Sequence, residues 1–483
     1  MLSRKKVLSL ESLNPRVKGI EIATLEHLTK RGEELEQDLE QGGQDRPFSE
    51  IVRCHRENLQ GMGQKPITFI QQVAAACAYP ELLNSASVAE DAKRRARGIL
   101  QDLDGSSIGC YNLRYICSSI PQKVAKFIER RDGGIPSNPR NIIMFPEASL
   151  FIKNVLALVC TEEEALQTGV LVPVPHCPVY TEALVLVNAV KVPYQLDEAN
   201  GWALRVAELR QAVQEGRKHC NPKVLCVINP GNPTGQLQSR KCLEDVIRFA
   251  AEENLLLFAD EVQQENVFGA GCSFHSMKKV LFEMGPTYSA TVQLVSCFSI
   301  SQGFTGECEL RAGCIEYVNI DPTVMDYILT TVTVSHSPIL GQIAVDVLMA
   351  PPLPEDPSYR SFMEEKQSTR ASLAENARLT QEMFHQAPGI HCGPIQGATF
   401  AFPRIHIPEK AVTRARDQGM EPDVFFCYQL LEETGIILAP GSAFGQAEGT
   451  YHFRMTLLPP REKLKTIVES IKEFQKKFLQ DYA

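Results

Sequence analysis

Apolar and polar residues alternate in blocks along the middle of the chain, and the blocks have two different periods. Short apolar runs typical of strands cover residues 224–228, 255–259, 293–298 and 314–318. Between the first two runs, apolar residues recur at helical spacing from Lys241 to Ala251. This succession, with strands that are apolar on both faces, predicts an α/β sheet of parallel strands covered by helices on both sides. Ligands of such sheets bind beyond the carboxyl ends of the strands, so the residues that follow each run are the first candidates for chemistry.

The pattern changes on both sides of this region. The first sixty or so residues are polar, and EELEQDLEQ at 33–41 predicts a helix with a solvated face, in an N-terminal arm rather than in the core. A Pro-rich stretch at 350–359 predicts a hinge, and a charged helix at 362–384 follows it. Short strands, such as 399–402, and a Lys-rich amphipathic helix complete the chain. We therefore expect three parts: an N-terminal arm with helices (1–90), a large α/β domain (91–350) and a smaller α+β C-terminal domain (351–483).

Composition excludes several classes of protein. The 483 residues are 44% hydrophobic and 22% charged, which is typical of a globular chain and not of a disordered one. A net charge of -9 disfavours nucleic acid and anionic membranes as partners, and the basic segment 91–100 is expected to be a solvated helix with acidic residues at its start. No apolar run approaches 18 residues, so no membrane span is predicted.

The cysteines and the N-terminus indicate a cellular compartment. The fifteen cysteines are scattered without a C-x-x-C pair, so we interpret them as reduced thiols, most of them buried. The opening MLSRKK is basic but is followed by no apolar segment of the kind a secretory signal needs. A cytoplasmic location is therefore the expectation, and no metal site is predicted.

Two adjacent strand ends carry the most informative residues. The run 224–228 leads directly into Asn229-Pro-Gly-Asn-Pro-Thr-Gly235, a rigid turn whose two asparagines offer side-chain amides above the sheet. The next run ends at Asp260, which places a carboxylate at the same edge of the sheet. Each feature also has a purely structural interpretation, because such a turn can be an ordinary loop and such an aspartate can cap the next segment.

Together these residues resemble the fold-type I pyridoxal-phosphate aminotransferases, and specifically the alanine aminotransferase family. The resemblance runs nearly from end to end, through SLNPRVKGIE, GMGQKPITFIQQV, FIERRDGGIP, CVINPGNPTGQLQSRKC, LLLFADEV, GECELRAG and LLEETGIILAPGSAFGQAEGTYHFRMTLLPP. It implies a two-domain fold, with a large domain around a mostly parallel sheet and a smaller α+β domain. It also implies a homodimer with sites at the subunit interface, and amino transfer between L-alanine and 2-oxoglutarate.

The resemblance assigns roles to three residues around the cofactor ring and the substrate. Asp260 corresponds to the residue that pairs with the ring nitrogen of pyridoxal phosphate, and Asn232 to the one that hydrogen-bonds the ring hydroxyl. Arg454 corresponds to the arginine whose planar fork holds the substrate's α-carboxylate, a bidentate contact that lysine makes poorly.

Four further residues correspond to the family's phosphate-binding site. Ser299 and Arg311 bind the phosphate group in the family, and the backbone N–H groups near Ala148 and Ser149 join them at a helix N-terminus, where anions are stabilised. The structural alternative is that Arg311 simply pairs with a nearby carboxylate.

The sequence departs from the family at the position that carries the chemistry. The family has S-x-S-K-G, where the lysine forms the Schiff base, whereas this chain has Gln302 in the lysine position. A glutamine amide neither condenses with an aldehyde nor acts as a base, so both duties of the lysine are lost. No lysine lies between Lys279 and Lys366, and Lys278 and Lys279 are interpreted as ordinary helix residues.

Five other departures cluster at the same site. Gln263 replaces a tyrosine that touches the ring hydroxyl, and Cys177 replaces the aromatic residue that stacks on the ring. Glu147 replaces a glycine in the phosphate loop, where its charge would repel the anion by about 1 kcal/mol. Ile116 replaces a glycine beside the substrate. Glu309 replaces another glycine two residues before Arg311, so its carboxylate can compete with phosphate for that arginine. We therefore expect pyridoxal phosphate to bind weakly and without a covalent bond.

Three hypotheses about function stay open on this basis. The first is an alanine aminotransferase homologue that has lost efficient turnover, a pseudoenzyme. The second is a working alanine aminotransferase, which requires a base other than Gln302. The third is a binding or regulatory protein that senses an amino acid or pairs with an active relative. Small amino acids and 2-oxo acids are the expected ligands in all three.

Overall fold

The computed structural model describes residues 8–18, 24–42, 46–110, 119–161, 166–332 and 337–483. The strands are β1 (Val52–Arg53), β2 (Ile142–Phe145), β3 (Thr168–Val174), β4 (Val190–Asp197), β5 (Ala203–Leu204), β6 (Asn221–Ile228), β7 (Leu256–Asp260), β8 (Leu294–Ser299), β9 (Gly313–Val318), β10 (Ile390–His391), β11 (Phe400–Ala401), β12 (Arg404–Ile405), β13 (Ile436–Ile437), β14 (Ala439–Pro440) and β15 (Tyr451–Thr456). The α-helices are α1 (Pro15–Lys18), α2 (Thr24–Glu40), α3 (Thr68–Ala78), α4 (Glu90–Asp102), α5 (Ile120–Arg131), α6 (Ala148–Val159), α7 (Val179–Leu186), α8 (Val206–Gly216), α9 (Arg240–Glu253), α10 (Met277–Glu283), α11 (Pro286–Ser289), α12 (Pro322–Val332), α13 (Ile339–Met349), α14 (Tyr359–His385), α15 (Glu409–Asp417), α16 (Pro422–Thr434) and α17 (Arg461–Asp481).

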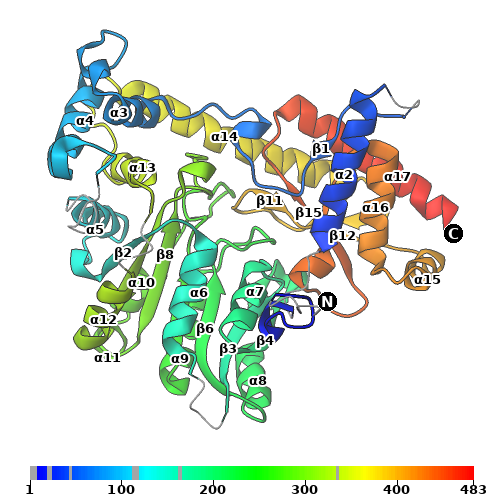
Figure 1. Cartoon of the computed structure of the whole chain (residues 1–483). Coiled ribbons are helices and arrows are strands. Elements are labelled where there is room, and N and C mark those ends of the chain that lie inside the picture. The colour runs from blue at the N-terminus through cyan, green and yellow to red at the C-terminus, as the bar shows by residue number, and fades with distance from the viewer. Residues whose placement is uncertain (1–7, 19–23, 43–45, 111–118, 162–165, 333–336) are drawn as a thin grey trace, which may run out of the picture.

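A large sheet of mostly parallel strands forms the centre of the fold, as predicted (Figure 1). Its strand order is β2-β9-β8-β7-β6-β3-β4-β5, and the four pairings from β8 through to β4 are parallel. The four apolar runs that predict strands correspond to β6, β7, β8 and β9. Side chains alternate between the two faces, and both faces are buried, so the runs are apolar throughout.

One of these strands, β9, does not have the predicted direction. The run 314–318 was expected to belong to the parallel set, but β9 pairs antiparallel with both β8 and β2. The connection from β8 to β9 contains only a short 3-10 turn, Cys308–Leu310, and no crossover helix. A parallel return usually needs a crossover helix that spans the length of the strand, and without one this connection reverses the chain.

Helices cover both faces of the large sheet. One face packs against α6, α7 and α12, and the other against α8, α9 and α10. Beyond β2, helices α3, α4, α5 and α13 form a further apolar cluster with the edge of the sheet, at the upper left of Figure 1. No helix of the described residues has the length and hydropathy needed to cross a bilayer.

The C-terminal residues form a second unit around a small antiparallel sheet. Strands β10, β12, β15 and β11 lie in that order, β14 also pairs with β15, and helices α15, α16 and α17 pack around them. The core of this unit includes Leu28 and Leu35 from α2, so the expectation of an N-terminal arm outside the core is wrong for this helix. Leu28 and Leu35 are seven residues apart and share one helix face. On α2, Gly32 leaves room for Ile437, whose Cδ1 atom would lie 2.5 Å from an added Cβ.

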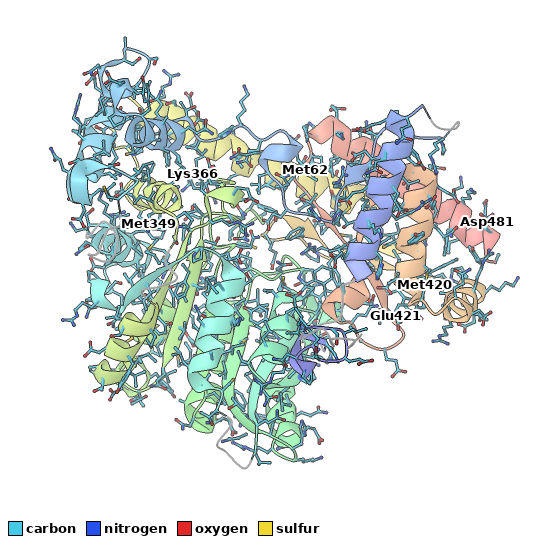
Figure 2. The ribbon with its side chains drawn as sticks, in the orientation of Figure 1. Met62, Met349, Lys366, Met420, Glu421 and Asp481 are labelled. Carbon is cyan, nitrogen blue, oxygen red and sulfur yellow. The ribbon has the colours of Figure 1, made fainter. Side chains whose placement is uncertain are left out.

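Helix α14 connects the two units. Phe362, near its start, packs edge-on against Phe304 beside the large sheet, with ring centroids 6.1 Å apart. Leu373, Ala377 and Phe384, further along, belong to the C-terminal core. Figures 1 and 2 show the helix running from α3 towards α17, with Lys366 near its first half. The helix is therefore shared by both units, and the division at 1–90, 91–350 and 351–483 stays a prediction.

Candidate active site

Strand ends of the large sheet bring the predicted site residues to one edge. Asn232 follows β6, Asp260 ends β7 and Ser299 ends β8. Arg311 precedes the antiparallel strand β9, whose first residue pairs with Ser299, and so reaches the same edge. Arg454 comes from β15 of the C-terminal unit and donates a hydrogen bond to Asn232, so the site lies between the two units.

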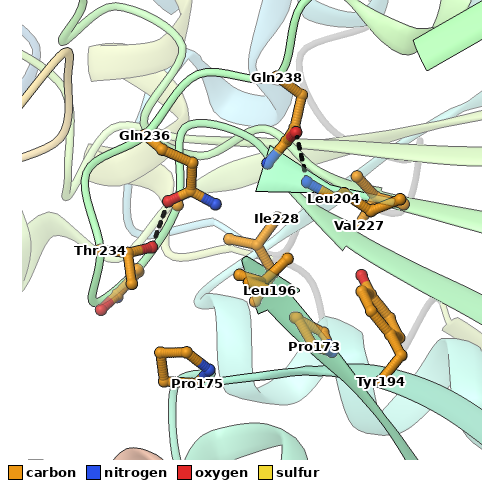
Figure 3. A pocket seen from close by; sticks show the side chains of 12 residues that line it. Pro173, Pro175, Tyr194, Leu196, Leu204, Val227, Ile228, Thr234, Gln236 and Gln238 are labelled. Carbon is orange, nitrogen blue, oxygen red and sulfur yellow. Dashed lines mark hydrogen bonds between the residues drawn. The ribbon is translucent and has the colours of Figure 1, made fainter. Parts of the chain in front are cut away.

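The two asparagines of the turn after β6 have different roles. Asn229 is buried, and its Oδ1 atom accepts a hydrogen bond of 2.9 Å from the backbone N–H of Gln238, which holds the turn. The Oδ1 atom of Asn229 is therefore used by the turn, while its Nδ2 atom is buried and makes no hydrogen bond among the described residues. Asn232 alone contacts the site through Arg454. Figure 3 shows the cavity beneath the turn, which at about 10 Å³ holds no more than one water molecule and is no ligand pocket.

Arg454 is a buried cation held in a fixed orientation. Only 8% of the residue is exposed. Its Nη1 atom donates to Asn232 Oδ1 at 3.1 Å, and its Nη2 atom donates to the carbonyl oxygen of His55 at 2.8 Å. The guanidinium carbon lies 3.9 Å from the ring centroid of Phe400 and 4.6 Å from that of Phe444. These contacts fix both the plane and the direction of the group.

The charge of Arg454 is not neutralised by a direct partner. It forms no ion pair within 4.0 Å with a carboxylate of the described residues, and its Nε atom is buried without a hydrogen-bond acceptor. Burial lowers the pKa of the guanidinium, partly offset by the charges of Cys177 and Glu57. A buried, oriented guanidinium without a carboxylate partner is suited to bind a carboxylate ligand.

Asp260 is buried at the end of β7 and receives a hydrogen bond that the sequence did not indicate. Tyr180 on α7 donates its phenolic proton to Asp260 Oδ2 at 2.7 Å. Burial raises the pKa of the Asp260 carboxyl, and the bonds from Tyr180, the backbone of Val262 and the Cys297 thiol oppose that shift. Tyr180 follows Cys177 by three residues, and no local pattern points it at the sheet edge.

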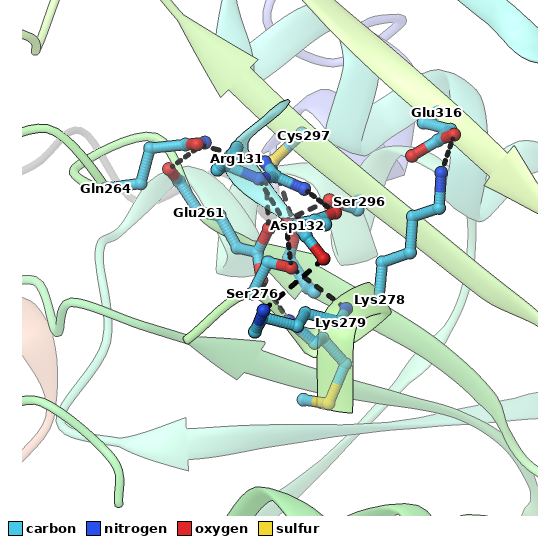
Figure 4. A network of polar contacts seen from close by, with 12 residues as sticks. Arg131, Asp132, Glu261, Gln264, Ser276, Lys278, Lys279, Ser296, Cys297 and Glu316 are labelled. Atoms are coloured by element: carbon cyan, nitrogen blue, oxygen red, sulfur yellow. Dashed lines mark hydrogen bonds and ion pairs between the residues drawn. The ribbon is translucent and has the colours of Figure 1, made fainter. Parts of the chain in front are cut away.

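A buried polar network supports the strand that carries Asp260 (Figure 4). Its neighbour Glu261 accepts hydrogen bonds from the backbone of Met277 at 2.6 Å and from Ser296 at 2.9 Å. Arg131 pairs with Asp132 at 2.7 Å and lies 3.9 Å from Glu261. The network ties α5 and α10 to the sheet, so its role is structural support.

The two lysines considered as substitutes for the missing one are engaged in this region. The ammonium of Lys278 is buried and pairs with Glu316 at 2.5 Å, and that of Lys279 pairs with Glu283 at 3.3 Å. Lys366 lies over the ring of Phe304, 4.5 Å from its centroid, but its ammonium pairs with Glu265 at 2.9 Å. Each of these three amines is an ion-pair partner.

Gln302 lies in a chain of amides. Asn266 donates to the backbone carbonyl of Gln302 and, at 2.8 Å, to the side-chain oxygen of Gln263. The Oε1 atom of Gln302 is buried and accepts no hydrogen bond from the described residues. Gln263 in turn donates through Nε2 to Glu57 Oε1 at 3.1 Å. Gln263 therefore belongs to this network through its side chain, whereas Gln302 joins it only through its backbone carbonyl.

Glu57 is, with Tyr180, a site residue that the sequence did not indicate. Its Oε1 atom accepts hydrogen bonds from Gln263 and, at 2.6 Å, from Thr399. Burial raises the pKa of its carboxyl, and the charge of Arg454 opposes that shift, which places Glu57 close to the carboxylate-binding arginine. Glu57 lies within the segment interpreted as an arm, four residues before GMGQKPITF, and that neighbouring motif is the only sequence signal near it.

Two of the four residues assigned to phosphate binding, Ser149 and Arg311, come together, but around a carboxylate of the chain itself. Glu147 directly precedes α6; its Oε1 atom accepts a hydrogen bond of 2.8 Å from Ser149, and its Oε2 atom pairs with Arg311 Nη1. The other terminal nitrogen of Arg311 pairs with Glu309 at 3.3 Å. The predicted competition of Glu309 for Arg311 is thus present in the structure.

The remaining predicted residues lie as follows. Cys177 precedes α7, and the charges of Arg454 and Asp260 both act on its thiol, whose pKa is raised by burial. Ser299 is buried, and its Oγ atom accepts a hydrogen bond of 3.1 Å from the backbone of Ser301. Ile116 lies outside the described residues.

Comparison with known proteins identifies the family. The family model described as aminotransferase class I and II matches residues 81–471. Alanine aminotransferase 2 of Xenopus tropicalis is 53% identical over 479 residues, which is 99% of this chain and 91% of that protein. Human alanine aminotransferase 1 is 50% identical over 481 residues, 99% of this chain and 97% of that protein. The chain belongs to the alanine aminotransferase family.

Solved structures confirm the fold that this family membership implies. The alanine aminotransferase of Pyrococcus furiosus superposes with a TM-score of 0.74 at 18% identity, covering 96% of this chain and 99% of the other. An aspartate aminotransferase of Thermus thermophilus gives a TM-score of 0.70 at 16% identity, covering 96% and 99%. At these identities the structures establish the fold-type I aminotransferase architecture alone.

The site of this family member fits only part of the pyridoxal phosphate implied by the resemblance. Asp260, Asn232 and Arg454, which the resemblance assigns to the ring and the substrate carboxylate, lie at one edge of the large sheet, and Arg454 is bonded to Asn232. Position 302 offers an amide in place of an amine, and Glu147 engages both Ser149 and Arg311, the side chains assigned to the phosphate. The residues present therefore do not fit a covalently held, phosphate-anchored cofactor.

Proposed function

We propose that the chain is an alanine aminotransferase homologue, descended from an enzyme for amino transfer between L-alanine and 2-oxoglutarate, that has lost efficient catalysis. The observation that carries this proposal is Gln302. A primary amide has no basic nitrogen and forms no imine with an aldehyde, so neither covalent attachment nor proton transfer is available at this position. Loss of a general acid/base alone lowers a rate by about 10²–10⁴.

The three lysines that flank Gln302 in the sequence are all engaged in ion pairs. Lys278, Lys279 and Lys366 each form an ion pair with a glutamate. Using one of them as a base requires breaking that pair, and for Lys278 and its buried partner Glu316 the rupture leaves an uncompensated buried charge. This supports an impaired enzyme over a working alanine aminotransferase.

Pyridoxal phosphate, on this proposal, binds weakly and without a covalent bond. Asp260, Asn232 and Ser299 remain as partners for the ring and the phosphate. Cys177 offers no aromatic face for stacking, a contact that contributes about 0.5–1.5 kcal/mol beyond buried area. Gln263 directs its amide to Glu57 and Asn266, and so is engaged away from a ring hydroxyl.

Arg454 supports a second candidate function, a non-catalytic protein that binds an amino acid or a 2-oxo acid. Its guanidinium is buried, oriented by four neighbours and without a carboxylate partner. Binding of a carboxylate requires none of the chemistry lost at Gln302. A homologue of this kind can sense a metabolite or pair with an active relative.

Assembly, domain division and location follow the family in this proposal. We infer a homodimer with sites at the subunit interface, an N-terminal part at 1–90, a large domain at 91–350 and a small domain at 351–483. Small-molecule amino acids and 2-oxo acids are the partners, with no nucleic acid and no membrane, and the location is cytoplasmic. Size-exclusion chromatography with light scattering tests the dimer directly.

The decisive experiment records the absorption spectrum and the turnover of the purified protein with added pyridoxal phosphate. We expect no band of a protein-bound imine and turnover of L-alanine with 2-oxoglutarate at least about 10² below that of an active relative assayed in parallel. An imine band that borohydride traps on the protein, or turnover equal to the relative's, would overturn the proposal.

A further inference from the structure

The phosphate position of this family holds a negative charge that belongs to the chain. Glu147 lies immediately before α6 in an extended backbone conformation, with φ of -161° and ψ of 160°. Its two carboxylate oxygens reach Ser149 Oγ and Arg311 Nη1. The hydroxyl of Ser149 has a single proton, which is committed to this bond.

The balance of charge at this position disfavours a second anion. Arg311 supplies one positive charge and the N-terminus of α6 about half of one, whereas Glu147 and the 88% exposed Glu309 both pair with Arg311 and supply two negative charges. A phosphate monoester, which carries between one and two negative charges at neutral pH, would enter a surrounding that is already negative. The side chains of Arg311 and Glu147 are 43% and 41% exposed, so solvent screens the pair, and its strength comes from proximity more than from low polarity.

A tethered carboxylate competes differently from a dissolved one. Glu147 is two residues from Ser149 and cannot diffuse away, so its effective concentration at the arginine far exceeds that of a free ligand. A phosphate group must displace both of its contacts before it can make its own. A ligand with an uncharged hydroxymethyl group in that position needs no displacement, because its hydroxyl can donate a hydrogen bond to the carboxylate.

We propose that Glu147 is a built-in anion that occupies the phosphate position, so that this site accepts 3-hydroxypyridine ligands without a phosphate group in preference to their phosphate esters. The inference rests on the proposed function only in taking the ring position near Asp260 and Asn232 as retained. It adds the residue and the group that set the selectivity.

The test compares dissociation constants for pyridoxal phosphate and pyridoxal, measured by quenching of the fluorescence of the single Trp202 and by calorimetry. Inorganic phosphate is the third probe. The full-length chain is compared with Glu147→Gly, Glu147→Gln and Glu309→Gln. The last is the matched control, because it removes a carboxylate from the same arginine without touching Ser149. Circular dichroism and denaturant midpoints establish that each variant is folded.

We expect the unmodified chain to bind pyridoxal at least as tightly as pyridoxal phosphate. Glu147→Gly and Glu147→Gln should each gain about tenfold or more in affinity for pyridoxal phosphate and for inorganic phosphate, against less than about threefold for Glu309→Gln. Affinity for pyridoxal should change by less than about threefold in every variant. Tenfold tighter binding of the phosphate ester by the unmodified chain, or no gain in either Glu147 variant, would overturn the inference.

These outcomes are separate from the fate of the proposed function. A trapped imine or normal turnover would contradict the role given to Gln302, whatever the ratio of the affinities for pyridoxal phosphate and pyridoxal. That ratio, and its change on substitution of Glu147, tests only the inference about the phosphate position.

Discussion

Replacement of Arg454 should weaken the binding of a carboxylate ligand strongly and change the free energy of unfolding only slightly. Arg454→Met keeps an unbranched side chain between Phe400 and Phe444 and removes the charge and both hydrogen bonds. Hydrogen bonds from a charged group contribute about 1.5–3 kcal/mol each, and each ring contact about 0.5–2 kcal/mol. Burial of an unpaired guanidinium costs several kcal/mol, so these contributions largely cancel. We expect the free energy of unfolding to change by less than about 2 kcal/mol.

Binding of a carboxylate should change much more than stability. Loss of the charged partner of a buried carboxylate costs about 2–5 kcal/mol, or about 30-fold to several thousand-fold in affinity. Titration calorimetry with L-alanine and with 2-oxoglutarate measures this loss, and urea unfolding measures stability in the same buffer. Arg454→Lys should recover only part of the affinity, because an ammonium lacks the planar fork.

A second buried arginine supplies the control. Arg131 pairs with Asp132, whose side chain is only 1% exposed, so Arg131→Met leaves a buried carboxylate without its cation. That change should cost about 3–5 kcal/mol of stability. If Arg454→Met destabilises the protein as much as Arg131→Met does, or if carboxylate affinity survives Arg454→Met, then Arg454 is a structural residue and the proposed binding of a carboxylate ligand is wrong.

Three further substitutions test other parts of the site. Gln302→Lys alone should restore little turnover, because Glu147, Gln263 and Cys177 remain, and adding Glu147→Gly should raise it further; full recovery from the single change would contradict this. Burial lowers the pKa of His55 from 6.5 to about 3, so the unfolded chain binds a proton below pH 6.5 that the folded chain rejects until about pH 3. The stability that His55 contributes is therefore fully present above pH 6.5 and falls as the pH drops, by about 2 kcal/mol at pH 5. Urea unfolding at pH 7 and pH 5 should show that His55→Asn loses about 2 kcal/mol less than the unmodified chain over this range. Equal losses in both proteins would refute this prediction. Tyr180→Phe leaves Asp260 Oδ2 without its phenolic donor and should lower the free energy of unfolding by about 1–3 kcal/mol, and an unchanged denaturation midpoint would show that this bond contributes nothing.

The sequence was most informative where a sheet edge gathers residues. Asn232, Asp260 and Ser299 follow apolar runs, and the carboxyl ends of parallel strands meet whatever the distance along the chain. The direction of β9 was harder to predict, because an antiparallel strand buried on both faces has the same apolar pattern as a parallel one.

Contacts between distant segments could not be read from local patterns. Arg454 is held by His55, Phe400 and Phe444, which come from three separate segments. Glu57 was missed for the same reason, since the polar segment around it has no periodicity that distinguishes a buried carboxylate from a solvated one. The sequence shows Glu147 as a departure from the family pattern, but only the structure shows that its carboxylate accepts a hydrogen bond from Ser149.

Helix α14 limits how far the two sides of the site can move apart. Its 27 residues form a rod of about 40 Å, and it is packed at one end against Phe304 and at the other into the C-terminal core. Arg454 lies on β15 of the C-terminal unit and Asn232 lies at the edge of the large sheet, and their hydrogen bond of 3.1 Å already joins the two units. A rotation that broke this bond to admit a larger ligand would have to bend the rod or slide its first turns over Phe304. The length and packing of one helix thus set an upper limit on the size of ligand that fits beside Arg454.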